Sequence, residues 1–428
     1  MITLQERVHK VKPPHEWPLH KLHHIFKVRR GNKNVGMLND NLLSLSYGKI
    51  IKKNIDTSEG LLPESFETYQ IVNPGDIVMR LTDLQNDKRS LRQGLVNEKG
   101  IISSAYDAIY PIKGHDSRFW AYALLAMDLA KYYYSLGGGV RQSIKFKDFP
   151  NDWIYAPLVK TQKKIADFLD YETARIDQLI EKKKKLVSLI NERFDSQINE
   201  VMSQFIPRKL KMIASTQLSN VDKHIYEDEI AVNVVHYTDV YYNDVITKNT
   251  TLPKGAVTAF EKQKFSLKGG EVLVTKDSET PDDIAIPAYI EGVKENTVCG
   301  YHLAIIRPNT TMLDGRFIFW GLKTKRVRDY FSLAAQGVTR FGIPIGKIAD
   351  CRVPYTSNLE VQKKIAHELF VKNEMKLHLN RAINQSIDRL KQFRDSLITE
   401  AVTGQLDLVL WKKRDNTGKH NIEEAIRT

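Results

Sequence analysis

The sequence predicts an α+β protein made of two similar halves, each a mixed globular domain followed by a long helix. Two observations carry this prediction. A helical motif occurs twice, 200 residues apart, and the stretch after each copy lacks Pro and Gly for roughly forty residues. The remaining sequence alternates short β-like runs with Gly, Pro and Asn turns.

The repeat is the most informative feature. Gln162-Lys-Lys-Ile-Ala166 recurs as Gln362-Lys-Lys-Ile-Ala366, and the same offset pairs Asp195-Ser196 with Asp395-Ser396 without gaps. Agreement sustained over some forty positions indicates two homologous segments. The chain therefore reads as domain, helix, domain, helix.

In the first long helix, apolar residues recur from Ile165 at alternating steps of four and three, with polar breaks at Glu172 and Lys183. This is typical of a coiled-coil seam, and the second long helix follows the pattern more loosely. Each helix would be about 60 Å long, and neither could bury its seam alone. We therefore expect the two helices of one chain to pair as an antiparallel coiled coil; the alternative is that each packs separately on its own domain. The expected seam comprises Ile165, Leu169, Ile176, Leu179, Leu186, Ile190, Leu379, Ile383, Ile387 and Leu390.

The globular segments predict compact α+β domains. Strands are expected at Asp76–Arg80, Glu271–Thr275 and Leu303–Ile306, and short helices at Phe119–Tyr134 and Phe317–Phe331. The predicted organisation is a first domain at 1–155, a central helix at 156–206, a second domain at 207–355, a distal helix at 356–404 and a polar tail at 405–428.

Composition favours a polyanionic partner. The chain has 64 Lys and Arg against 51 Asp and Glu, a formal net charge of +13. Its two cysteines, Cys299 and Cys351, form neither a zinc motif nor a disulfide framework. The N-terminus lacks a secretory signal and no apolar run could cross a bilayer, so a cytoplasmic location without membrane association is expected.

Catalytic signatures are not apparent. Asn73-Pro74-Gly75-Asp76 has Gly and Asp where an adenine methyltransferase motif carries Pro and an aromatic residue. Gly342–Ile348 is one residue short of a phosphate-binding loop, and the histidines near the N-terminus lack metal-ligand spacing. We therefore expect no catalytic residue, no metal site and no cofactor on this chain.

Several basic residues beside glycine, amide or aromatic residues are candidates for DNA contact, because Arg, Lys and Gln can bind phosphates or base edges. For any one of them a solvated surface charge is the plainer interpretation. Arg141 and Arg340 stand out because each follows a glycine turn at a related place in the two halves. The candidates are Arg80, Lys88, Arg89, Arg92, Arg141, Gln142, Lys276 and Arg340.

The helix motifs resemble the specificity subunit of type I restriction-modification enzymes. The strongest match is Arg394-Asp-Ser-Leu-Ile-Thr-Glu-Ala-Val-Thr-Gly-Gln-Leu-Asp407, which is similar to the distal helix end in that family, and the two Gln-Lys-Lys-Ile-Ala strings resemble its helix starts. The chain departs from the family pattern at Thr161 and Val361, where Glu is frequent, and its first helix ends without an Ala-Val-Thr-Gly string.

The resemblance implies two target-recognition domains, each reading one half of a bipartite site in double-stranded DNA, with the helices as a spacer. It also implies two modification (methyltransferase) subunits as partners, which would carry S-adenosylmethionine, and restriction (motor-nuclease) subunits where cleavage occurs. Two other hypotheses stay open: an enzyme, which methyl transfer by the purified chain would favour, and a structural coiled-coil adaptor without a nucleic-acid role.

Overall fold

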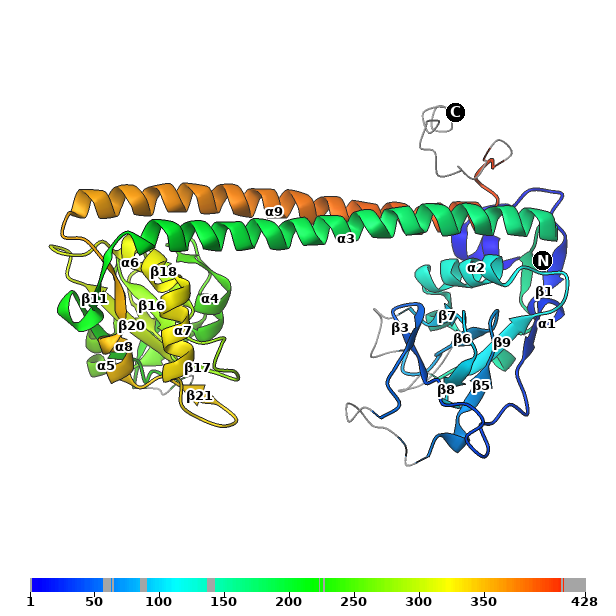
Figure 1. Cartoon of the computed structure of the whole chain (residues 1–428), viewed down its shortest axis with the longest axis horizontal. Coiled ribbons are helices and arrows are strands. Elements are labelled where there is room, and N and C mark those ends of the chain that lie inside the picture. The colour runs from blue at the N-terminus through cyan, green and yellow to red at the C-terminus, as the bar shows by residue number, and fades with distance from the viewer. Residues whose placement is uncertain are drawn as a thin grey trace. The chain divides into compact units, whose positions relative to one another are not determined.

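The computed structural model describes residues 2–56, 63, 65–84, 91–136, 143–222, 224–225, 228–408 and 411. Its contacts divide the chain into two compact units. Unit 1 comprises 1–182 and 385–428, and unit 2 comprises 183–384 (Figure 1). Each long helix therefore contributes one part to each unit.

Unit 1 is built around an antiparallel sheet in the order β2-β9-β6-β7, with three two-stranded pairs, β1-β10, β3-β4 and β5-β8, beside it. Its strands are β1 (Leu19–Lys21), β2 (Phe26–Val28), β3 (Leu43–Ser46), β4 (Lys49–Lys52), β5 (Gln70–Val72), β6 (Ile77–Met79), β7 (Gln93–Leu95), β8 (Gly100–Ile102), β9 (Asp107–Pro111) and β10 (Trp153–Tyr155). Its helices are η1 (Gln5–His9), α1 (Leu22–Ile25), η2 (Phe66–Thr68), α2 (Ser117–Leu129), η3 (Tyr132–Ser135), η4 (Phe146–Asp148) and the first part of α3 (Val159–Ser203).

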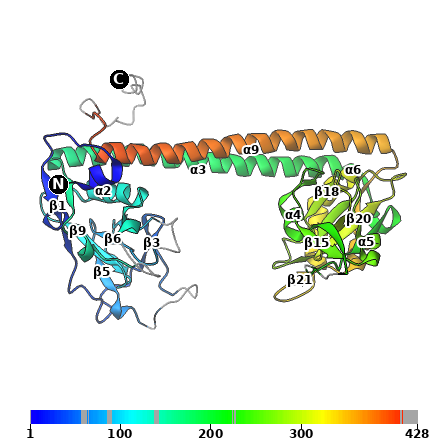
Figure 2. The same ribbon diagram turned by 180° about the vertical axis from the view of Figure 1, so that it is seen from behind.

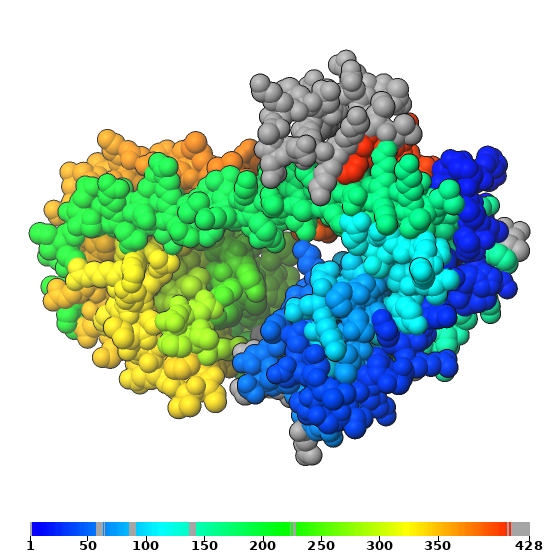
Figure 3. All heavy atoms as spheres, turned by 45° about the vertical axis from the view of Figure 1, so that its right-hand side comes forward, coloured from blue at the N-terminus to red at the C-terminus, as the bar shows by residue number. Residues whose placement is uncertain are grey.

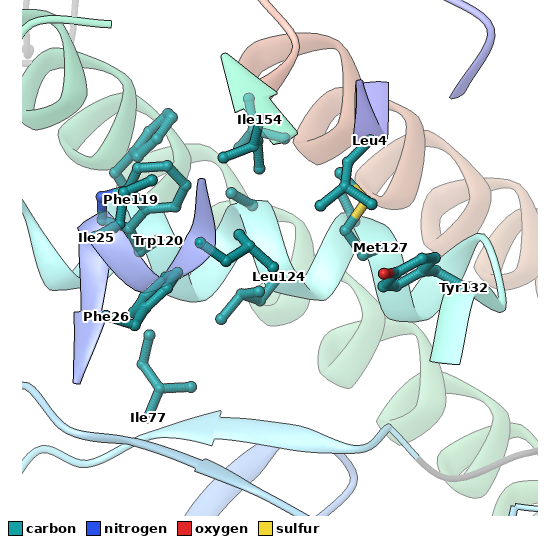
Figure 4. Close-up of a cluster of buried hydrophobic side chains, with 14 of the residues drawn as sticks. Leu4, Ile25, Phe26, Ile77, Phe119, Trp120, Leu124, Met127, Tyr132 and Ile154 are labelled. Carbon is teal, nitrogen blue, oxygen red and sulfur yellow. The ribbon is translucent and has the colours of Figure 1, made fainter. Parts of the chain in front are cut away.

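Helix α2 forms the core of unit 1, because it is apolar on nearly all sides. Phe119, Trp120 and Leu124 are at most 1% exposed and belong to one cluster with Ile77 of the sheet (Figure 4). The same cluster takes in the start of α3 and the end of α9 (Leu359–Val402). The layers of unit 1 are therefore sheet, α2 and the long helices (Figure 2).

Unit 2 repeats the order of the four central strands and adds a fifth. Its main sheet is β12-β20-β16-β18-β14, accompanied by β15-β13-β19, β11-β22 and β17-β21. Its strands are β11 (Ile206–Lys209), β12 (Ala214–Leu218), β13 (Ile230–Val235), β14 (Val245–Ile246), β15 (Lys254–Val257), β16 (Val272–Thr275), β17 (Asp277–Ser278), β18 (Pro287–Ile290), β19 (Thr297–Cys299), β20 (Leu303–Pro308), β21 (Phe341–Gly342) and β22 (Arg352–Tyr355). Its short helices are η5 (Leu210–Met212), α4 (Tyr237–Tyr242), α5 (Ala259–Phe265), α6 (Gly315–Leu322), α7 (Lys325–Ala334) and α8 (Ile345–Asp350).

The predicted mixture of helix and sheet is confirmed, and the three expected strands correspond to β6, β16 and β20. The expected helix at Phe317–Phe331 is wrong as a single element. The structure divides it into α6 and α7, because Thr324 has extended dihedral angles and its hydroxyl donates to the carbonyl of Gly321 at 2.7 Å. The expected helix at Phe119–Tyr134 likewise ends at Leu129 and continues only as the short η3.

The repeated glutamine has a physical role in unit 1. Gln162 is 1% exposed; its Oε1 accepts the backbone N–H of Asp116 at 2.9 Å, and its Nε2 donates to the carbonyl of Pro157 at 2.8 Å. Asp116 itself caps α2, since its carboxylate accepts two backbone N–H groups of the first turn. One buried amide thus ties the start of α3 to the start of α2.

Unit 2 has the same arrangement. Gln362 is 0% exposed; its Oε1 accepts the N–H of Asp314 at 2.8 Å, and its Nε2 donates to the carbonyl of Thr356 at 2.6 Å. Asp314 caps α6 through the N–H of Phe317. The motif that predicts a helix start from sequence therefore also fixes that start to the globular part of its unit.

The long helices contact each other in both units, and the contacts run antiparallel. In unit 1, Arg394 donates to Asp177 at 2.7 Å. In unit 2, Asn380 donates to Asn191 at 2.9 Å, and Lys376 lies 4.6 Å from the Phe194 ring centroid. The space-filling view shows side chains of α3 at the surface along much of the helix (Figure 3).

The predicted seam is right in part. Ile165, Leu169, Ile176, Ile383 and Ile387 are buried, and Ile190 and Leu390 are half-buried.

Leu179, Leu186 and Leu379 are 43%, 47% and 47% exposed, so their assignment to the seam is wrong. The buried face passes instead through Ile180 and Asn380, one residue later. A strict seven-residue repeat drifts around a helix of 3.6 residues per turn, so extrapolating it moved these leucines onto the wrong face.

Both cysteines are free and buried in unit 2. Burial raises the pKa of both thiols, to about 12 for Cys351. Among the helices of the described residues, none has the length and apolar character required to span a bilayer.

Two alanine variants test the corrected seam. Ile387→Ala should lower the free energy of unfolding by about 2–5 kcal/mol, because Ile387 is 4% exposed and its loss leaves a cavity. Leu379→Ala, the matched control, should cost less than about 1 kcal/mol. Thermal and urea denaturation followed by circular dichroism measure both, and an equal loss in the two variants would contradict the corrected register.

Candidate nucleic-acid interface

The structure describes four of the eight predicted contact residues: Arg80, Arg92, Lys276 and Arg340. Lys88, Arg89, Arg141 and Gln142 lie outside the described residues. Arg92 is buried in the interior of unit 1, and Arg80 is half-buried beside Tyr106. Lys276 and Arg340 lie at one edge of unit 2.

Arg92 is an interior residue, which corrects its prediction as a contact. It is 0% exposed; its guanidinium donates to the carbonyls of Thr82 and Asp83 at 3.1 and 3.4 Å and to the Tyr134 hydroxyl at 3.2 Å. Its backbone N–H donates to Asp128, whose pKa burial raises to about 6. Arg92 thus supports the chain after β6 and has no surface for a phosphate.

Lys276 and Arg340 come together in unit 2, at the edge formed by β17 and β21. These strands pair through Asp277 with Gly342 and Ser278 with Phe341, at the end of unit 2 away from α3 (Figures 1 and 2). Lys276 donates to Asp277 at 3.1 Å, and its Nζ lies 4.6 Å from the centroid of the Tyr301 ring. With a side chain only 14% exposed, Lys276 is largely neutralised within the fold.

A tight loop presents Arg340. The backbone groups of Gln336 and Gly342 exchange two hydrogen bonds, of 2.9 and 2.8 Å, and close the loop between them. Gly337 adopts φ +142°, and a Cβ there would lie 1.9 Å from the Arg340 carbonyl oxygen. Only glycine fits this turn. Gly337 therefore shapes the loop that exposes Arg340.

His302 connects the two strands. Its Nδ1 lies 2.6 Å from Asp277 Oδ2, and the Nη2 of Arg340 lies 3.3 Å from both ring nitrogens. Burial opposes ionisation of Asp277, but hydrogen bonds from His302 and Lys276 outweigh it, and the pKa of Asp277 falls below its ordinary value. Asp277 is therefore a carboxylate at neutral pH, able only to accept.

Tyrosines of α4 lie beside this edge. The rings of Tyr237 and Tyr241 stack with centroids 5.5 Å apart, and the Tyr241 hydroxyl donates to Asp283 at 2.7 Å. Burial and the charge of Asp283 raise the pKa of Tyr237, and the nearby charge of Arg340 offsets only part of this rise. Exposed cations beside aromatic faces suit phosphates and bases.

Unit 1 has a cation and an aromatic ring at the same end of the corresponding strands. Arg80 directly follows β6, and its guanidinium lies 5.9 Å from the centroid of Tyr106, which directly precedes β9. Lys276 directly follows β16, and Tyr301 precedes β20 by two residues. The strand pairs β6·β9 and β16·β20 are both antiparallel.

Sequence reasoning missed Asp277, Tyr301, His302 and Tyr106. Their only signal is an aromatic residue just before one strand and a cation just after another, and this has meaning only once the pairing of those strands is known. Among the described residues, no cluster of three or more His, Cys, Asp or Glu side chains could hold a metal ion.

Comparison with solved structures identifies the fold. The chain is similar to a chain from a structure that addresses complex assembly and conformational transition of the type I R-M system, with TM-score 0.69 and 13% identity, covering 92% of this chain and 100% of the other. It is also similar to the crystal structure of the HsdS subunit from Thermoanaerobacter tengcongensis, with TM-score 0.51 and 14% identity, covering 94% of this chain and 100% of the other. No family model matches the sequence, and no curated protein matches it. The chain therefore has the fold of type I specificity subunits over nearly its whole length.

Replacing Arg92 and Arg80 compares a fully buried arginine with a half-buried one at the end of β6. Arg92→Ala should lower the free energy of unfolding by about 3–5 kcal/mol, because it leaves a cavity and buried oxygens that have lost their hydrogen-bond donor. Arg80→Ala should change it by less than about 1 kcal/mol and instead weaken DNA binding.

Thermal denaturation and a salt titration of duplex binding check the two effects. An Arg92→Ala protein with native stability and reduced DNA affinity would contradict the interior assignment.

Proposed function

We propose that this chain is the specificity subunit of a type I restriction-modification complex, in which each globular domain reads one half of a bipartite DNA site. The observation that carries the proposal is the strand order shared by the two units, β2-β9-β6-β7 and β12-β20-β16-β18, each ending in a long helix tied by a buried glutamine. Two readers of the same design in one chain suit a site with two halves.

The units differ outside that common frame, which supports different half-sites. Within the part of the chain that the structure describes, unit 2 has β13, β15 and β19 as a second three-stranded sheet, and unit 1 has the β3-β4 hairpin. Unit 1 offers Arg80 beside Tyr106, whereas unit 2 offers Arg340 beside His302. A common scaffold with different edge residues is what reading two unlike sequences requires.

The long helices would set the spacer and receive two modification subunits. Their contact face includes polar pairs such as Asn191 with Asn380 and Asp177 with Arg394, which favour one register over a slipped one. Leucines outside that face are exposed, and exposed apolar groups on a helix suit a partner protein. They are Leu179, Leu186, Leu189, Leu377 and Leu379.

Catalysis would belong to the partners. S-adenosylmethionine is expected on the modification subunit, and restriction subunits would join for cleavage. The net charge of +13 supports a role on DNA over a purely structural adaptor. DNA affinity no greater than that of a generic basic protein, measured with the partners present, would favour the adaptor.

Exchange of one domain tests the modular design. Replacing residues 1–155 with the matching domain of a relative should change one half-site and leave the other intact, because each unit has its own core. Sequencing of methylated adenines in DNA from cells that co-express the partner subunits gives both half-sites. A simultaneous change in both half-sites would show that the domains do not read independently.

Lengthening the helices tests the spacer. Seven residues added to both α3 and α9 extend the pair by about 10 Å, so the gap between half-sites should grow by roughly three base pairs. The same methylation mapping measures the gap. An unchanged gap would rule out the helices as the spacer.

A further inference from the structure

At the β17-β21 edge of unit 2, three side chains contact one another in series, and the last of them, Arg340, is exposed. Asp277 accepts from His302, and His302 contacts Arg340. Asp277 and His302 have side chains 19% and 27% exposed, whereas Arg340 lies on the surface. Exposure therefore increases from the Asp277 carboxylate, through the His302 ring, to the Arg340 guanidinium.

The hydrogen bond between Asp277 and His302 can form in only one direction. Because the Asp277 carboxylate can only accept, His302 Nδ1 must carry the proton that it donates. Arg340 Nη2 lies 3.3 Å from both ring nitrogens, which places it over the face of the His302 ring. Asp277 thereby holds the His302 ring in one orientation, and the face of that ring supports the guanidinium of Arg340.

Two backbone features support this arrangement. His302 has φ +70°, a left-handed conformation that His and Asn tolerate better than most residues. The Lys276 N–H donates to the His302 carbonyl at 2.9 Å, so the backbone of His302 is held beside the residue that precedes Asp277. Within the described residues, the Arg340 guanidinium contacts His302 only through Nη2, and its other N–H groups remain available.

We propose that Asp277 and His302 position Arg340 to recognise a guanine in the half-site read by unit 2. Arginine bound by two hydrogen bonds to O6 and N7 is the commonest base-specific contact in the major groove, and it needs a fixed guanidinium plane. This inference rests on the proposed function. Arg340 touches the base, whereas Asp277 and His302 are positioning residues.

Lys276 does not take part in positioning Arg340. Asp277 neutralises it, and it covers the Tyr301 ring, so unit 2 does not use it as unit 1 would use Arg80. Removing the charge of Asp277 should free Lys276 for phosphates. The same change should therefore weaken base discrimination and strengthen non-specific binding, two effects of opposite sign that a purely structural role would not produce.

The test uses the full chain with its modification subunit, a DNA library randomised in both half-sites, and a non-specific duplex titrated with salt. Arg340→Ala should relax the guanine preference at one position of one half-site by on the order of 10-fold to 100-fold. His302→Asn, which suits the φ +70° backbone and removes the ring that supports the guanidinium, should relax the same position.

Asp277→Asn completes the series. It should relax that position less strongly and steepen the dependence of log K on log salt by up to about 0.9, the value for one added phosphate contact. Lys268→Ala removes a cation at the other end of β16 and should leave the base preference unchanged, which makes it the control.

The outcomes separate the two proposals. Relaxation of the same position by all three variants supports the positioning chain. Relaxation by Arg340→Ala alone overturns the roles of His302 and Asp277. Unchanged half-sites in every variant, with a bipartite site still read by the wild type, overturn the inference and leave the proposed function standing. A wild-type complex without sequence preference overturns both.

Discussion

The buried glutamine amide at the start of each long helix is the interaction on which the architecture depends. Gln162 and Gln362 each satisfy a backbone N–H of a capping Asp and a carbonyl of the approaching chain. A buried amide without partners would cost about 1–3 kcal/mol, so this geometry is strongly selected once the helix docks. The direction in which each long helix leaves its domain is thereby set at one residue.

That anchor leaves the opposite end of each sheet free to vary. In unit 2 the anchored helix α6 and the β17-β21 edge lie at different ends of the domain, so the edge residues can change without disturbing the helix (Figure 1). The buried cluster around Trp320 and Phe317 separates the two ends and includes residues of both long helices. Stability and recognition are in this way assigned to different regions of one domain.

The sequence predicts the helices well and the site poorly, for a physical reason. Helices follow local periodicity, and the Gln-Lys-Lys-Ile-Ala strings are local, so both long helices were predictable. The register of their contact was not, because Leu179 and Leu379 fit a seven-residue repeat that the real helices do not keep. The sequence predicts Arg92 as a surface cation, because Tyr134, which covers and hydrogen-bonds its guanidinium, is 42 residues away along the chain. The link between Asp277 and His302 spans 25 residues and depends on which strands pair.

The distribution of thiols has a practical consequence. Both cysteines of the sequence, Cys299 and Cys351, are buried in unit 2, and burial disfavours their reactive thiolate forms. A soluble alkylating reagent can therefore modify the native chain only when unit 2 opens transiently. The rate of modification therefore measures local opening of unit 2 and carries no information about unit 1. Thiol labelling of the unmodified sequence can follow the conformational fluctuations of one unit.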